Sequence, residues 1–253
     1  MNTSSLQCPT ISIITVCRNS AATIAKTIES ILVQKDPGVE YLIVDGASTD
    51  GTQDIVSSYQ AIDLFISEPD KGIADAFNKG IQLATGDIIG LVNSDDELSP
   101  SAVATVRRYF SEHPDVEVVH GDVLLFEGRR VVKRLKPSGR WWYPWRLVLF
   151  NHPSTFVRRE VYRRYGLFDD CYKIAMDVEI FLRWLSQGVI IGYLPHLLAK
   201  MQAGGISDQH AALGYREFRT AALQHGFSPL LTHLQFMGKL VVWRLLQLKD
   251  KVS

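Results

Sequence analysis

Apolar residues in the first hundred positions follow two alternating patterns. Short, almost unbroken apolar runs are typical of strands buried on both faces of a sheet, and apolar residues that recur every three or four positions are typical of helices. Alternation of the two with short connections predicts a parallel sheet covered by helices on both faces. The predicted strands are 11–16, 41–44, 62–66 and 87–92, and the predicted helices begin after Ser20 and cover 52–59 and 73–84.

The pattern becomes less regular after Pro100. The expected elements are a helix through Val103, Val106 and Phe110, hairpin strands 117–126 and 129–135, helices 158–165 and 177–187, and a strand at 189–194. Neither a repeat nor a low-complexity linker interrupts residues 1–228, so we expect a single α/β domain. Its sheet should be Rossmann-like and mostly parallel, with a smaller antiparallel portion in the second half.

A C-terminal amphipathic helix is expected over 229–253. Leucines recur there at the helical period with His233, Lys239, Arg244 and Lys249 between them. Such a helix can pack on the core or lie flat on an anionic membrane surface.

The composition limits the choice of partners and compartment. The 27 basic and 27 acidic side chains cancel, so nothing in the overall charge attracts nucleic acid, and we expect no nucleic-acid partner. Three scattered cysteines form neither a disulfide framework nor a zinc motif. The first ten residues lack the pattern of a secretory signal, so a cytoplasmic protein is expected.

Polar clusters follow the predicted strands at the points where they end. In open α/β sheets, ligands bind in the crevice at the carboxyl ends of the strands. Asp95 and Asp96 follow the strand 87–92 directly, and adjacent carboxylates repel each other unless a cation lies beside them. A divalent ion with oxygen ligands is the usual solution, although a turn in which such residues bond their own backbone is the simpler alternative. The other clusters are 15–19, 44–51 and 67–72.

Six motifs between about residues 11 and 210 together resemble those of the family 2 glycosyltransferases. They are ISIITVCRN, VDGASTDGT, SEPDKGIADAFNKGI, ATGDIIGLVNSDDEL, HPSTFVRREVYRRYGLFDD and MDVEIFLRW. The resemblance implies a GT-A fold and an inverting transferase. It also implies a nucleoside diphosphate sugar as donor and Mg²⁺ or Mn²⁺ as cofactor. In that organisation 10–99 is the nucleotide-binding half and 100–228 the acceptor-binding half.

The resemblance also assigns roles to single residues. Asp45 corresponds to the carboxylate that accepts a hydrogen bond from the base, and Asp95 to the metal ligand. Asn93 stands where the first aspartate of the DxD motif usually lies, which should weaken metal binding without donor. The implied donor-binding residues are Thr15, Arg18, Asp45, Asp70, Lys71, Ser94, Asp96 and His152.

Asp177 corresponds to the catalytic base of that family. An acceptor hydroxyl must lose its proton as it attacks the anomeric carbon, and a positioned carboxylate can accept that proton. The simpler alternative is that Asp177 only stabilises a helix amino terminus through the helix dipole.

Two other functions stay as alternatives to a glycosyltransferase. A sugar nucleotidyltransferase would need a glycine-rich loop after the first strand, and 15–21 contains no glycine. A catalytically silent nucleotide-sugar-binding protein is favoured only by Asn93. The aromatic residues of 141–145 can stack on acceptor sugars or enter a membrane interface, or they can pack in the second half of the chain. The basic stretches 129–136 and 158–164 are of a kind that usually forms solvated faces, but both suit a lipid-linked glycan acceptor of bacterial polysaccharide synthesis. The enzyme would then be peripheral at the inner face of the plasma membrane.

Overall fold

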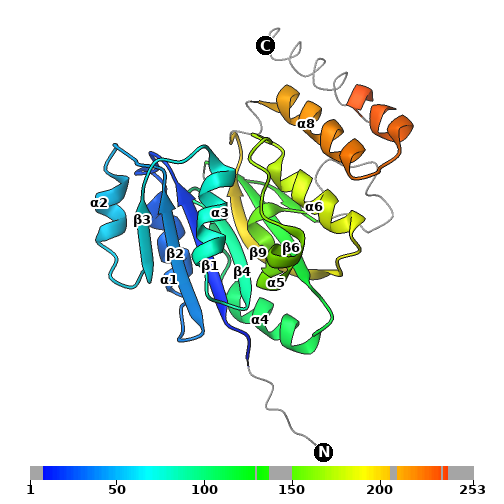
Figure 1. The fold of residues 1–253 in the computed structure, drawn as a ribbon. Coiled ribbons are helices and arrows are strands. Elements are labelled where there is room, and N and C mark those ends of the chain that lie inside the picture. The colour runs from blue at the N-terminus through cyan, green and yellow to red at the C-terminus, as the bar shows by residue number, and fades with distance from the viewer. Residues whose placement is uncertain (1–7, 129, 137–149, 206–209, 235, 239–253) are drawn as a thin grey trace, which may run out of the picture.

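In the part of the chain that the structure describes, nine strands form one sheet with helices on both faces (Figure 1). The computed structural model describes residues 8–128, 130–136, 150–205, 210–234 and 236–238. Within them the strand order is β3-β2-β1-β4-β8-β6-β9-β5, and β7 pairs with β6. The predicted α/β class is confirmed.

The first half alternates strands and helices, as predicted. Strands β1 to β4 are mutually parallel, which places all their carboxyl ends at one edge of the sheet. The chain enters β1 from below in Figure 1, so this is the upper edge in that view. The elements are β1 (Ile11–Cys17), α1 (Ile24–Leu32), β2 (Val39–Asp45), α2 (Thr52–Ser57), β3 (Leu64–Ser67), α3 (Ile73–Leu83) and β4 (Ile88–Asn93).

The second half is mixed in strand direction. Strand β8 (Thr155–Arg158) is antiparallel to both β4 and β6 (Val118–Glu127), whereas β9 (Ile191–Gln202) runs parallel to β6. The short strand β5 (Glu97–Leu98) closes the order by pairing with β9, and β7 (Arg130–Leu135) forms the predicted hairpin with β6. The helices are α4 (Ala102–Glu112), the 3₁₀ turn η2 (His152–Ser154), α5 (Arg159–Tyr165), α6 (Met176–Ser186) and α8 (Ala211–Gln224).

Two predictions for this half need correction. The sequence showed no strand at 155–158, because four residues between Pro153 and a helix are too few for a visible alternation. The strand predicted at 189–194 continues to Gln202 through Pro195. The register between β6 and β9 shifts beside that proline, between Gly121 and Asp122, and such an irregularity lets a strand accommodate proline.

Each face of the sheet has its own hydrophobic cluster. One contains Ile24, Ile28 and Ile31 of α1 together with α4 residues. The other contains Phe77 of α3, Met176 and Ile180 of α6 and Phe218 of α8. The start of α6 is therefore anchored to the same face as α3, the helix that follows the 67–72 loop.

The tail is helical at 229–234 and 236–238. Leu230, Leu234 and Met237 are 68%, 53% and 46% exposed, whereas Thr232 is buried. The remainder of the predicted tail helix, the aromatic residues of 141–145 and Arg129 lie outside the described residues. Among those described, no helix has both the length and the apolar character needed to cross a membrane.

Candidate functional site

The first three strands end in register at the candidate site. Cys17 of β1 pairs with Asp45 of β2, and Asp45 pairs with Ser67 of β3. Val16 pairs with Asn93 of β4, so the loop with both aspartates starts beside the loop after β1. The clusters identified in the sequence therefore meet at one edge, as the parallel arrangement requires.

Hydrogen bonds between these loops fix their backbones. The amide of Asn19, which has a left-handed φ of 51°, donates to Ser48 Oγ over 2.7 Å. The hydroxyls of Ser20 and Ser94 share a hydrogen bond of 2.8 Å. Ser94 was predicted to bind donor, and this contact places it between the loops after β1 and β4.

Asp45 stabilises the loop after β2 through hydrogen bonds to its buried carboxylate. Its side chain has no exposed surface. It accepts hydrogen bonds from the Ser48 amide at 2.9 Å, from the Ser48 hydroxyl and from Ser67 Oγ at 2.7 Å. Burial of the Cys17 thiol and the neighbouring Asp45 carboxylate raise the pKa of that thiol well above the usual value, so Cys17 stays protonated and donates to Asp45. The predicted contact of Asp45 with a base stays a prediction.

Two other predicted donor-binding residues are also buried. The Thr15 side chain lies inside the sheet, where Tyr41 donates its hydroxyl hydrogen to Thr15 Oγ1 at 3.1 Å. The Asp96 carboxylate points inward and accepts a hydrogen bond from the Asn93 amide at 3.1 Å. Burial, with the Asp95 charge as a smaller cause, raises the pKa of Asp96 well above its ordinary value. The structure does not bring these two side chains to the surface of the site.

Arg18, Lys71 and Asp95 are exposed at this edge, and Asp70 is half-buried beside them. Gly46 makes room for Asp70, since a Cβ atom at Gly46 would lie 2.2 Å from Asp70 Oδ2 and 3.4 Å from Arg18 Cδ. The end of β2 is thus backbone without a side chain at Gly46, bordered by the Asp70 carboxylate and the Arg18 side chain. No sequence pattern indicates this close approach of Asp70 to Gly46.

Lys79 supports the turn that carries Asp70 and Lys71, and the sequence analysis missed it. Its Nζ lies 2.8 Å from Glu68 and 3.4 Å from Asp75, and it donates to the Pro69 carbonyl at 2.9 Å. Hydrogen bonding to Glu68 raises the pKa of Lys79. The spacing of Asp75 and Lys79 by four residues on one helix is a signal that could have indicated part of this arrangement.

Asp95 is the acidic side chain of the 93–96 segment that could hold a cation. Partial burial raises the pKa of this carboxyl, and among the described residues no basic side chain forms an ion pair with it. A hard cation with oxygen ligands fits such a group. Because Asp96 faces inward, the segment offers one outward carboxylate, and other ligands would have to come from the substrate or water.

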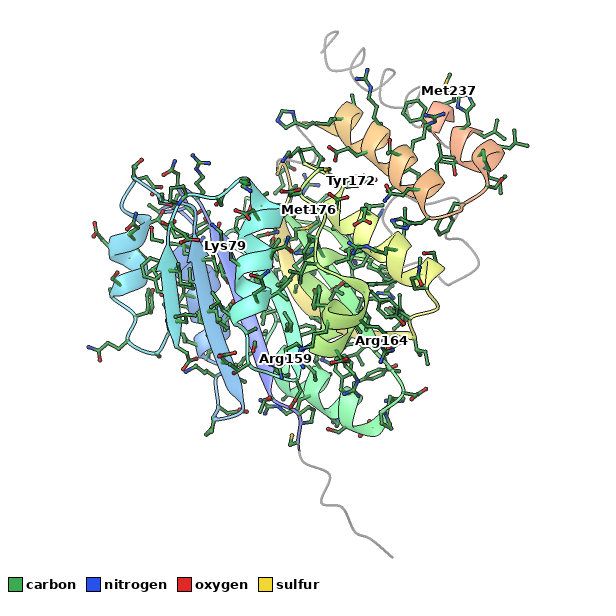
Figure 2. All side chains as sticks on the ribbon, in the orientation of Figure 1. Lys79, Arg159, Arg164, Tyr172, Met176 and Met237 are labelled. Atoms are coloured by element: carbon green, nitrogen blue, oxygen red, sulfur yellow. The ribbon has the colours of Figure 1, made fainter. Side chains whose placement is uncertain are left out.

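Asp177 lies in the first turn of α6, which begins at Met176. Figure 2 places Met176 toward the same upper edge as the strand ends. Burial raises the pKa of Asp177 to about 6, although its carboxylate accepts a hydrogen bond from the Val178 amide at 2.8 Å. A carboxyl with this pKa is ionised at neutral pH and basic enough to accept a proton.

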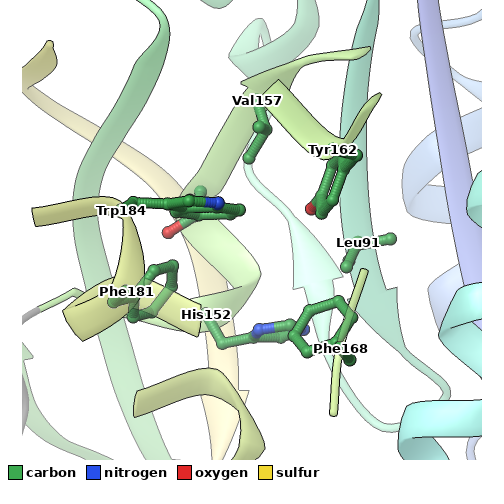
Figure 3. A pocket seen from close by; sticks show the side chains of 8 residues that line it. Leu91, His152, Val157, Tyr162, Phe168, Phe181 and Trp184 are labelled. Carbon is green, nitrogen blue, oxygen red and sulfur yellow. The ribbon is translucent and has the colours of Figure 1, made fainter. Parts of the chain in front are cut away.

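His152 packs among aromatic rings beside a small cavity. Its ring centroid lies 5.1 Å from that of Phe77 and 6.3 Å from that of Phe168. Figure 3 shows the imidazole on the cavity wall between Phe181 and Phe168, with Trp184 nearby. Burial lowers the pKa of His152 to about 4, so the ring is neutral at pH 7 and brings no charge to a phosphate.

The basic stretch 158–164 has structural roles away from this edge. Arg158 donates to the Val116 and Phe110 carbonyls, and Arg159 donates to the Ala84 carbonyl. Arg159 and Arg164 lie at the edge opposite to Met176 (Figure 2). Their position disfavours the interpretation of this stretch as part of an acceptor surface at the site.

Comparison with known families identifies the chain. Residues 12–181 match the family model "Glycosyl transferase family 2", which covers more than half of the sequence. The chain belongs to glycosyltransferase family 2. The predicted membership and the prediction of a glycosyltransferase are confirmed, and the alternative of a sugar nucleotidyltransferase is not supported.

Related proteins and structures extend over most of this family 2 enzyme. It is 29% identical over 213 residues to a PGL/p-HBAD biosynthesis glycosyltransferase of Mycobacterium bovis, with 79% of this chain and 80% of that protein covered. It is 28% identical over 192 residues to the putative glycosyltransferase EpsE of Bacillus subtilis, with 71% and 68% covered.

Two solved structures share the fold. TarS of S. aureus has a TM-score of 0.68 at 20% identity, covering 88% of this chain and 68% of that one. The mannosyltransferase PcManGT of Pyrobaculum calidifontis has a TM-score of 0.65 at 20% identity, covering 92% and 69%, and was solved with GDP-Man and Mn²⁺. The GT-A fold predicted from the sequence is confirmed.

Proposed function

We propose that this enzyme is an inverting glycosyltransferase that moves a sugar from a nucleoside diphosphate donor to a hydroxyl group of a glycan acceptor. The observation that carries the proposal is the place of the Asp177 carboxyl in the first turn of α6 of a family 2 enzyme. Burial there raises its pKa to about 6, which agrees with a role as base. One carboxylate of this kind suffices for inversion with a metal-assisted leaving group.

In the proposed reaction the acceptor hydroxyl attacks the anomeric carbon from the side opposite the diphosphate. The Asp177 carboxylate accepts the hydroxyl proton while the bond between the anomeric carbon and the diphosphate oxygen breaks. The configuration at that carbon inverts because attack and departure occur on opposite faces. A positioned base contributes about 10²- to 10⁴-fold to the rate.

The other end of the site would bind the donor. Arg18 and Lys71 are exposed cations suited to phosphate oxygens, and Asp70 borders the open backbone at Gly46 where a base could approach. Asp95 would hold Mg²⁺ or Mn²⁺, which offsets the charge that develops on the leaving diphosphate. The solved complexes of TarS with UDP-GlcNAc and of PcManGT with GDP-Man and Mn²⁺ support a donor of this class.

For the acceptor we propose a lipid-linked glycan of bacterial surface or exported polysaccharide synthesis, used at the cytoplasmic face of the membrane. The relative in Mycobacterium bovis is named for PGL/p-HBAD biosynthesis. Leu230, Leu234 and Met237 are exposed on the tail at helical spacing, and such a row of apolar side chains suits contact with a membrane surface.

A donor panel tests the proposal. Thermal unfolding is measured with UDP-, GDP- and dTDP-sugars, each with and without Mn²⁺, because a ligand at 100 times its dissociation constant stabilises by about 2.7 kcal/mol. We expect one nucleotide class to raise the melting temperature, and more strongly with Mn²⁺. NMR of the released or transferred sugar should then show an inverted anomeric configuration. Absence of binding by every donor, or retention of configuration, would contradict the proposal.

A further inference from the structure

Glu217 of α8 binds the segment that leads into the helix of Asp177. Its carboxylate accepts hydrogen bonds from three consecutive backbone amides. The Lys173 amide donates to Oε1 at 2.9 Å, and the Ile174 and Ala175 amides donate to Oε2 at 2.8 Å each. A carboxylate that accepts several backbone N–H groups forms charge-assisted hydrogen bonds, which are about twice as strong as neutral ones.

The start of α6 has no side-chain cap of its own, and the three residues that lead into it are held by Glu217. Ala175, the residue before the helix, has no side chain that can accept a hydrogen bond from the first turn. Ser, Thr, Asp or Asn usually stands at that position and fixes the entry of the chain. Here Glu217 fixes the entry from more than forty residues away.

Further contacts join α8 to the same region. His225 Nε2 lies 2.8 Å from Glu179 of α6, and Glu179 also pairs with Arg183 at 2.8 Å. The Tyr172 hydroxyl donates to Gln224 at 2.9 Å. The residues just before α6 and its first turn are therefore held against α8 at several points.

Glu217 lies beyond residues 12–181, the stretch that matches the family model. A Cβ at Gly214, one turn before Glu217, would lie 3.1 Å from Ile174 Cγ2. The α8 backbone thus lies close enough to Ile174 for the Glu217 side chain to bring its carboxylate to the amides of 173–175. Asp177 follows these amides by two residues, so a displacement of the 173–175 backbone would displace its carboxylate.

We propose that Glu217 is a positioning residue that sets the place of the Asp177 carboxylate by holding the 173–175 backbone. The inference rests on the proposed role of Asp177 as base. A base acts only within hydrogen-bond reach of the proton that it removes, and a misplacement of about 1 Å can lower the rate about 100-fold. In this proposal Glu217 acts through the backbone that it holds and does not touch the reacting groups.

The test compares Glu217→Gln with Glu160→Gln. Glutamine keeps the shape of the side chain but replaces one accepting oxygen by a donor, so at least one of the three hydrogen bonds is lost. Glu160 is a matched control because it is 61% exposed on α5 and pairs with Arg163 over 3.7 Å. Hydrogen exchange of the free proteins is measured at the 173–175 amides, and turnover is measured with the donor selected by the panel.

We expect the 173–175 amides of Glu217→Gln to exchange roughly tenfold faster than those of Glu160→Gln. Turnover should fall about 10- to 100-fold while the dissociation constant of the donor stays unchanged. The acid limb of the turnover profile should also move to lower pH, because a loosened Asp177 is better solvated. A merely structural weakening would lower the melting temperature without moving that limb.

Unchanged exchange at 173–175, or faster exchange with normal turnover, would overturn the inference. If Glu217→Gln does not fold, Glu217→Asp keeps the charge and shortens the reach, and the same slower turnover with intact donor binding is expected. Asp177→Asn separates the two proposals. Full turnover in that variant refutes the base, whereas an inactive Asp177→Asn beside a normal Glu217→Gln refutes only the positioning role.

Discussion

The raised pKa of Asp177 predicts a specific dependence of activity on pH. With a pKa of about 6, the carboxyl is about 9% ionised at pH 5 and about 91% ionised at pH 7, from the ordinary titration relation. If the ionised form is the base, turnover should rise about tenfold between these two pH values and level off above pH 7. An unperturbed aspartate, with a pKa of about 3.9, would give almost no change over that range.

The same carboxyl should make the folded state less stable at neutral pH. Its folded pKa lies above the unfolded value of 3.8 by about two units, and each unit corresponds to about 1.4 kcal/mol. The penalty is therefore about 3 kcal/mol once the group is ionised, above pH 6, and it disappears as the pH falls from 6 toward 4. Asp177→Asn should accordingly be more stable than the natural protein at pH 8 and similar at pH 4, while transfer is lost.

Nucleoside diphosphate release between pH 5 and pH 8 measures the first effect, and denaturant unfolding at pH 4 and pH 8 measures the second. Asp54→Asn is the control, because Asp54 is exposed on α2 at the far side of the sheet from α6. A flat profile together with an Asp177→Asn variant that is less stable at pH 8 would refute both the desolvated environment of Asp177 and its role as base.

Three further outcomes follow from the site and the tail. Gly46→Ala should push the Asp70 carboxylate by about 1 Å and weaken donor binding about 10- to 100-fold with little change in melting temperature. Equal donor affinity by calorimetry would count against donor binding beside Gly46. Asp95→Asn should remove most of the Mn²⁺-dependent part of the donor-induced thermal shift, and an undiminished Mn²⁺ effect would exclude Asp95 as ligand. Replacing Leu230 and Leu234 together by Asp should reduce co-sedimentation with phosphatidylglycerol vesicles; unchanged sedimentation would argue that this face of the tail does not meet lipid.

Periodicity predicted the first half of the fold because each buried strand there is continuous and each helix has one apolar face. It failed where the structure depends on partners far along the chain. Strand β8 is four residues long and is defined by its pairing with β4 and β6. The extension of β9 past Pro195 depends on a register shift against β6, which no local pattern encodes.

The meeting of the strand-end clusters at one edge of the sheet was predictable, but the direction of their side chains was not. A strand end shows where a residue lies along the sheet, yet neighbouring side chains at that end point to opposite sides. Asp95 faces outward, whereas Asp96 and Asp45 are enclosed by partners that the sequence did not link to them. The hydrogen bonds between Glu217 and the 173–175 amides could not be predicted either, since they join positions more than forty residues apart.

The carboxylate of Asp45 links the ends of β1, β2 and β3, and this affects how each of them responds to a substitution. Cys17, Ser48 and Ser67 come from three different strand ends and all donate to it. These three strand ends are thus joined through one carboxylate, and we expect that loosening any one of them weakens the anchorage of the other two. Substitutions at separate tips are coupled in their effects, because groups in one hydrogen-bond network do not act independently.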